Sequence, residues 1–86
     1  MTAWTARIRV TLKPAVNDPQ GLAIAGGLRQ LGFSDISGVR AGKFFDIQLN
    51  STDQATAEAQ VAEMCRRLLA NPVIEDYTFE VTATDP

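Results

Sequence analysis

Few residues in this chain could carry out chemistry, and the commonest catalytic groups are missing. The 86 residues include no histidine and one cysteine, Cys65. Without histidine the chain cannot form a Ser–His or Cys–His nucleophile pair, or the usual zinc ligand sets. A lone cysteine also excludes an internal disulfide. These absences exclude most of the chemistry of small enzymes.

The remaining candidates for catalysis have simpler explanations. Cys65 follows the apolar periodicity of a helix, whereas a reactive thiolate needs a positive and partly exposed setting, so we interpret this cysteine as part of the core. Glu75 and Asp76 could act as an acid–base pair. Because consecutive strand residues face opposite sides of a sheet, however, these carboxylates should not converge on one substrate. We expect them to be solvated or to contact another protein.

Basic residues suggest anion or nucleic-acid binding at two places. Arg40 and Lys43 flank a glycine turn that could hold a phosphate, but a phosphate loop needs several converging amides or a helix N-terminus. Arg7 and Arg9 lie on the outward side of an alternating strand, as in an RNA-binding sheet, but that module carries stacking aromatic residues on the same face. Because the net charge is also −2, we expect no nucleic-acid partner.

These side chains are positioned by six expected elements. Alternation of apolar and polar residues predicts strands over residues 4–12, 36–40, 43–50 and 77–82, with a turn at Ala41 and Gly42 that joins the middle two as a hairpin. Helical spacing predicts helices over about residues 19–31 and 54–70. We therefore expect one α+β domain, a two-layer sandwich in ferredoxin-like βαββαβ order. Its antiparallel four-stranded sheet would carry both helices on one face.

The ends of the chain and of its helices follow from local signals. Asp18 and Pro19 are typical of a helix start and Gly32 of a helix end, whereas Ser51 and Gln54 fit a capping box for the second helix. The helix faces expected to be buried comprise Ala23, Ile24, Gly27, Leu28 and Leu31 in the first helix and Ala57, Val61, Met64, Cys65 and Leu68 in the second. Residues 83–86 should form a loose tail. No apolar run approaches the roughly 18–20 residues of a membrane span, so we expect no membrane partner.

Charge is divided unevenly along the chain. Residues 1–43 hold six basic and two acidic groups, a net of +4, and residues 44–86 hold two basic and eight acidic groups, a net of −6. The expected strand order places Arg7 and Arg9 on the outward face of the sheet. Asp46 and Glu80 would lie beside them, in cross-strand pairs worth about 0.2–1 kcal/mol each. We expect the imbalance to be neutralised across a face that suits contact with another protein.

Five segments in succession carry a family resemblance. They are residues 10–14 (VTLKP), 18–21 (DPQG), 28–33 (LRQLGF), 39–43 (VRAGK) and 64–77 (MCRRLLANPVIEDY). Together they resemble the PurS family, the small subunit of phosphoribosylformylglycinamidine synthase, over about residues 7–81. The sequence departs from the family pattern at Ala15, Leu22 and Phe44.

The resemblance implies a purine-biosynthesis complex in the cytoplasm. In that complex a glutaminase subunit releases ammonia from glutamine. A synthetase subunit uses ATP and magnesium to convert formylglycinamide ribonucleotide into the amidine. The small subunit holds the two enzymes together and is implied to carry no catalytic, cofactor-binding or metal-binding residue. It is implied to form a homodimer or a dimer of dimers.

The resemblance and the expected loops together suggest two interaction surfaces. Partner subunits would meet loop residues that match the family, namely Arg40, Gly42, Lys43, Asn71, Pro72, Glu75, Asp76 and Tyr77. Self-association would use the outward sheet face, namely Thr5, Arg7, Arg9, Phe44, Asp46 and Gln48. Reversing the charges of Arg40 and Lys43 is expected to abolish the complex and to leave the free dimer folded.

One alternative is an ACT-like regulatory module that binds a small molecule such as an amino acid. That module shares the order of elements and needs a ligand groove, often glycine-lined, at a dimer interface. Gly26, Gly27 and Gly32 are its candidates here, although Gly27 could instead permit a close approach of the first helix to the sheet. Stabilisation by one amino acid in a thermal-shift screen would favour this alternative.

Overall fold

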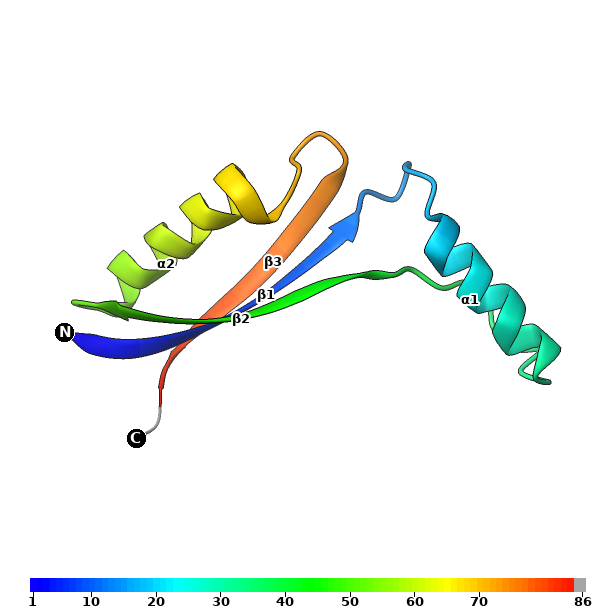
Figure 1. Ribbon diagram of the computed structural model, residues 1–86, viewed down its shortest axis with the longest axis horizontal. Helices are drawn as coiled ribbons and strands as arrows, with labels where there is room; N and C mark the ends of the chain where they lie inside the picture. Colours follow the sequence, from blue (N-terminus) through cyan, green and yellow to red (C-terminus); the bar gives the residue numbers. More distant parts are fainter. Residues whose placement is uncertain (85–86) are drawn as a thin grey trace.

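Three strands form one antiparallel sheet with β1 at its centre (Figure 1). The strands are β1 (Thr2–Leu12), β2 (Gly42–Ser51) and β3 (Glu75–Ala83), in the order β2–β1–β3. Apolar residues of β1 alternate to one face as expected, and Ala6, Ile8 and Val10 are fully buried there. The computed structural model describes residues 1–84. The α+β class expected from the sequence is confirmed.

One helix covers the apolar face of the sheet. It is α2 (Gln54–Met64), continued by a π-helical turn, η1 (Cys65–Leu69). Ala57, Val61 and Cys65 of the predicted face are fully buried in one cluster with the β1 residues. The prediction for Leu68 is wrong, since this residue is 84% exposed. Ala70 N–H donates to the Cys65 carbonyl at 3.0 Å, and this wider turn rotates Leu68 away from the helical face.

The second helix begins at a different cap from the one expected. Asp53 is the N-cap, and its carboxylate accepts a hydrogen bond from Thr56 N–H at 2.7 Å. Ser51 is instead paired with Thr2 as the last residue of β2, and Gln54 donates to the Val81 carbonyl at 3.0 Å. The predicted capping box is therefore wrong, because strand pairing retains Ser51 in the sheet.

The first helix, α1 (Pro19–Gln30), stands away from the sheet (Figure 1). Its boundaries follow the prediction, since Asp18 caps its start and Gly32, just beyond its end, has a φ of +101°. The expected burial of its apolar face is wrong, since Ile24 is 42% exposed and Leu31 is 77% exposed. A single chain therefore does not carry two helices on one face of its sheet.

The chain returns from α1 to the sheet through residues 31–41, which form no strand. The hairpin expected over residues 36–50 is therefore wrong, and the sheet described by residues 1–84 has three strands instead of four. Gly42, expected in the hairpin turn, begins β2 opposite Thr11. Arg29 of α1 donates to the Ile36 carbonyl at 3.1 Å, which holds the returning segment beside the helix and away from the sheet edge. We call residues 19–41 the arm.

Part of the expected C-terminal tail belongs to the sheet. Ala83 is the last residue of β3, and Thr84 N–H donates to the Ala3 carbonyl at 2.9 Å. Residues 85–86 lie outside the described residues.

Candidate functional site

Polar side chains from three segments meet where β1 ends and where β2 and β3 begin. Thr11 of β1 lies opposite Gly42 of β2 and opposite Asp76 of β3. This register brings together the two loop groups that were predicted to meet partner subunits. We call this surface the polar end, and it consists of Lys13, Arg40, Lys43, Glu75 and Asp76.

Each carboxylate of the polar end has its own cation. Lys13 Nζ lies 2.9 Å from Asp76 Oδ1, and Lys43 Nζ lies 3.4 Å from Glu75 Oε2. Glu75 Oε1 also accepts a hydrogen bond from Asn71 N–H at 2.7 Å. That bond, together with the neighbouring Lys43 ammonium, holds the pKa of Glu75 below its ordinary value. The two carboxylates are therefore engaged separately, as expected for adjacent strand residues.

Arg40 ties the end of the arm to the end of β1 and the loop that follows it. Its Nη2 donates to the carbonyl oxygens of Leu12, Lys13 and Val16, at 3.3, 2.9 and 3.1 Å. A carboxylate at position 40 would face these carbonyls, so charge reversal there would disturb the loop as well as any interface. Lys43, whose side chain is half exposed, is the cleaner probe of this surface.

A buried carboxylate fixes the same junction from the other side. Asp18 is 4% exposed, and its two oxygens accept hydrogen bonds from Gly21 N–H at 2.9 Å and Ala41 N–H at 2.8 Å. These bonds, together with the nearby Arg40 charge, hold the pKa of Asp18 below its ordinary value. The sequence indicated the first bond, which is a normal helix cap, but carried no signal for the second. Asp18 and Arg40 together make the arm a fixed extension of the sheet.

The connection before β3 is shaped by Asn71, whose Oδ1 accepts a hydrogen bond from Val73 N–H at 3.1 Å. Pro72 and Val73 are exposed between these bonded groups, and Val73 is 78% exposed. Val73 was not among the residues predicted to meet partners, because a single apolar residue in a loop has no periodic pattern. Tyr77 is half-buried, and its ring stacks against Phe79 with centroids 6.4 Å apart.

The outward sheet face agrees only in part with the expected charge pairing. Arg7 lies in register between Asp46 and Glu80, as predicted. Arg9 lies opposite Phe44 instead, with its guanidinium carbon 5.5 Å from the centre of that ring. Within residues 1–84, neither arginine forms an ion pair. The prediction of carboxylate neighbours is therefore right for Arg7 and wrong for Arg9.

Thr5 and Gln48 extend the outward face as a hydrogen-bonded polar surface. The Thr5 hydroxyl donates to Gln48 Oε1 at 3.0 Å, and Gln48 Nε2 donates to Asp46 Oδ1 at 3.0 Å. The six residues assigned to self-association from the sequence thus lie on one face of adjacent strands β1 and β2.

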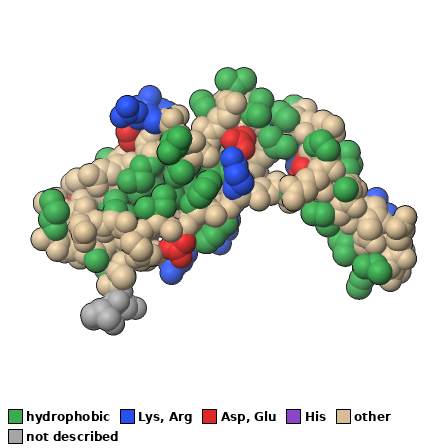
Figure 2. Space-filling model, viewed as in Figure 1, with side chains coloured by type: hydrophobic (Ala, Val, Ile, Leu, Met, Phe, Trp, Pro, Cys, Tyr) green, Lys and Arg blue, Asp and Glu red, His purple; other side chains and the backbone are tan. Residues whose placement is uncertain are grey.

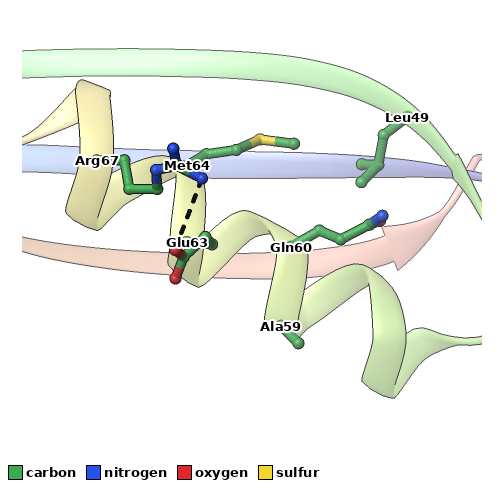
Figure 3. A pocket seen from close by; sticks show the side chains of 6 residues that line it. All are labelled: Leu49, Ala59, Gln60, Glu63, Met64 and Arg67. Atoms are coloured by element: carbon green, nitrogen blue, oxygen red, sulfur yellow. Dashed lines mark ion pairs between the residues drawn. The ribbon is translucent and has the colours of Figure 1, made fainter.

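An apolar groove that no sequence pattern predicted lies between α2 and β2 (Figure 3). The groove measures about 650 Å³, and its lining residues are Leu49, Ala59, Gln60, Glu63, Met64 and Arg67. Leu49 lines it from β2, while the ion pair between Glu63 and Arg67, at 4.0 Å, lies toward its other end. We call it the α2–β2 groove. Two smaller hollows, of about 340 and 240 Å³, adjoin the polar end.

The surroundings of Cys65 and of the arm glycines bear on two earlier candidates, a reactive thiol and a glycine-lined ligand groove. Cys65 is fully buried, and burial raises the pKa of its thiol, as a core residue requires. A Cβ built on Gly26, Gly27 or Gly32 would meet no atom within 4 Å, so Gly27 makes no close approach to the sheet, and none of the three lines the hollows described above. Among the described residues, no group of three or more potential metal ligands was found, and no helix is long and apolar enough to cross a membrane.

Comparison with known proteins gives consistent matches across nearly the whole chain. The PurS family model, described as phosphoribosylformylglycinamidine (FGAM) synthase, matches residues 5–83. The PurS subunit of this synthase from Synechocystis is 49% identical over 83 residues, which are 96% of this chain and 83% of that one. The PurS subunit from Bacillus subtilis is 38% identical over 91% of this chain and 92% of that one.

Solved structures agree with these sequence matches. PurS of Thermus thermophilus has a TM-score of 0.86 at 34% identity and covers 96% of this chain and 99% of its own. A chain of the PurLQS structure from Thermotoga maritima has a TM-score of 0.85 at 30% identity, over 98% of this chain and 100% of its own.

Proposed function

Since the chain belongs to the PurS family, we propose that it serves as the small subunit of phosphoribosylformylglycinamidine synthase in purine biosynthesis. The observation that carries this proposal is the similarity in sequence and fold over nearly the entire chain. The match to a chain of a structure described as PurLQS supports a role inside a complex.

Within that complex the chain would act by assembly and not by catalysis. It would join the glutaminase subunit to the ATP-dependent synthetase subunit, so that ammonia reaches formylglycinamide ribonucleotide without escaping to water. ATP, magnesium and glutamine would be used by those subunits, and the complex would work in the cytoplasm. Two features support this role: the Cys65 thiol is buried in the core, and Glu75 and Asp76 are each paired with a lysine.

The polar end is the surface that we assign to the partner subunits. Its two ion pairs remain partly exposed, so charged groups of a partner can compete for them while the sheet stays intact. The neighbouring residues Gly42, Asn71, Pro72 and Tyr77 would belong to the same contact. We assign the outward sheet face to a contact between copies of the chain, as in a dimer of dimers, because its side chains carry both signs of charge.

Reconstitution tests the assembly role directly. The chain is mixed with the cognate synthetase and glutaminase, and glutamine-dependent formation of the amidine is measured with each component left out in turn. We expect activity only when all three chains are present. Full glutamine-dependent activity without this chain would refute the assembly role.

Lys43→Glu tests the proposed surface. The substitution puts a second carboxylate beside Glu75, and we expect it to weaken binding to the partner subunits by about tenfold or more. Glu58→Lys, an exposed charge reversal on α2, is the control and should bind normally. Circular dichroism should show both variants folded. Wild-type assembly by Lys43→Glu would remove the polar end from the interface.

A further inference from the structure

Three exposed apolar residues lie close together in sequence on the connection from α2 to β3. Leu68, in the π-helical turn η1, is 84% exposed, and Val73, in the loop before β3, is 78% exposed. Pro72, next to Val73, is exposed as well. Figure 2 shows hydrophobic side chains gathered at the top of the molecule, where this connection turns. A single exposed apolar residue needs no explanation, but these residues form a patch, which we call the apolar knob.

The loop that carries most of the knob is fixed by its own hydrogen bonds, and Asn71 makes all of them. Its N–H donates to Glu75 Oε1 at 2.7 Å, and its Oδ1 accepts from Val73 N–H at 3.1 Å. Its carbonyl oxygen accepts from the N–H groups of Ile74 and Glu75 at 3.1 and 2.7 Å. Since Pro72 has no N–H, every backbone N–H between residues 71 and 75 is bonded within the loop.

Both ends of this loop are held by the body of the protein. Ala70, just before it, is 7% exposed and belongs to the core cluster. At the other end Lys13 N–H donates to the Ile74 carbonyl at 2.8 Å. The knob therefore presents its side chains on a fixed backbone, and a partner that covers them loses little conformational entropy in ordering the loop.

Charged groups of both signs flank the knob. On the side of α2, Arg66 pairs with Glu63, and this pair is open to solvent. On the other side the knob adjoins the polar end, because Glu75 follows the loop and its carboxylate, which accepts from Asn71 N–H, also pairs with Lys43. An apolar centre with a polar rim is the usual anatomy of a protein–protein interface.

We propose that the apolar knob enters an apolar pocket on one of the two enzyme subunits, and that the polar end and the Arg66–Glu63 pair form the rim of that contact. The inference rests on the proposed assembly function and names the centre of its interface. The knob is continuous with the surface assigned to the partner subunits, and its rim complements a protein surface that carries charges of both signs. An anionic lipid surface fits less well, because Glu63 and Glu75 would be brought against it.

Val73→Asp and Leu68→Asp test the contact, because each puts a carboxylate at its apolar centre. Binding of each variant to the synthetase, to the glutaminase and to the two together is measured by calorimetry under the conditions of the reconstitution. We expect both variants to raise the dissociation constant for the same subunit by about tenfold or more. Val73→Thr, which keeps the shape of the side chain, should bind more tightly than Val73→Asp.

Leu22→Asp is the matched control. Leu22 is 64% exposed and lies on the arm, outside the knob, so the same change of an exposed leucine to a carboxylate should leave binding unchanged there. Circular dichroism should show all variants folded, since neither Leu68 nor Val73 belongs to the core. The isolated variants should also sediment in the same oligomeric state as the wild-type chain.

Each contrary result has its own meaning. If the wild-type chain binds its partners and both Asp variants of the knob bind equally well, the knob is not the centre of the interface, and the assembly function stands. A wild-type chain that binds neither subunit would overturn both proposals. Knob variants that sediment as smaller species would show a contact between copies, and knob-dependent binding to phosphatidylserine vesicles would show a membrane contact. Either of these results would overturn the inference as well.

Discussion

Alanine substitutions at Gly21 and Gly26, both in α1, should change stability in opposite directions. A Cβ on Gly21 would enter the space of the Val39 carbonyl oxygen and lie 2.7 Å from Asp18 Oδ2. A Cβ on Gly26 would meet no atom within 4 Å. Since both residues belong to the same helix, alanine brings a similar gain in helix propensity at each, about 1 kcal/mol within the helix interior.

At Gly21 the steric conflict outweighs that gain. The clash can be relieved only if the returning segment at Val39 moves away from α1, and such overpacking costs about 1–3 kcal/mol. The same movement weakens the bond from Ala41 N–H to Asp18, which adds to the cost. We expect Gly21→Ala to lower the free energy of unfolding by about 1–2 kcal/mol and Gly26→Ala to raise it by up to about 1 kcal/mol.

Urea unfolding followed by circular dichroism measures both variants. All samples should be at one protein concentration, because the stability of an oligomer depends on concentration. In a domain of this size 1 kcal/mol corresponds to roughly 4–8 °C in Tm, so thermal unfolding of the same samples should show the two variants about 10–20 °C apart. A Gly21→Ala protein as stable as wild type would refute the close packing at the base of the arm.

Three further predictions concern the core and the carboxylates. Val61→Ala should lower the free energy of unfolding by about 2 kcal/mol, and Leu68→Ala should change it by less than about 0.5 kcal/mol, as urea midpoints will show. A thiol reagent should modify Cys65 only in unfolded protein, since burial shields the thiol and raises its pKa; labelling with and without urea checks this. The pKa values of Asp18 and Glu75 are lowered on folding, so their stabilisation is full above the ordinary carboxylate pKa of about 4 and is lost as the pH falls below it through their lowered folded pKa values. Urea midpoints should fall over that range, and less steeply in Asp18→Asn.

Features set by near neighbours in the chain could be predicted. The alternation from Trp4 to Leu12 identified β1, and the signals at Asp18 and Gly32 bounded α1, because strand faces and helix caps depend on residues within one or two turns. The strand predicted over residues 36–40 is wrong, since a pattern of only five residues does not distinguish a strand from an extended connection.

The candidate site was predictable as two loop groups but not as one surface. Lys43 and Glu75 were both named from the sequence, yet their ion pair depends on the registers of two strand pairs. The hydrogen bonds of Arg40 were not predicted, because its partners are backbone carbonyl oxygens. Every residue carries such a carbonyl, so the sequence does not indicate which of them an arginine will contact.

The sequence by itself determined the α+β class, the core position of Cys65, the lack of histidine chemistry and the resemblance to the PurS family. Only the tertiary structure decided where α1 lies and that Asp18 and Arg40 hold the arm away from the sheet. The physical reason is that hydrophobic periodicity reports that a helix face needs to be buried, but not which surface buries it. The sequence of α1 suits packing on its own sheet, but the hydrogen bonds at the base of the arm place the helix away from that sheet.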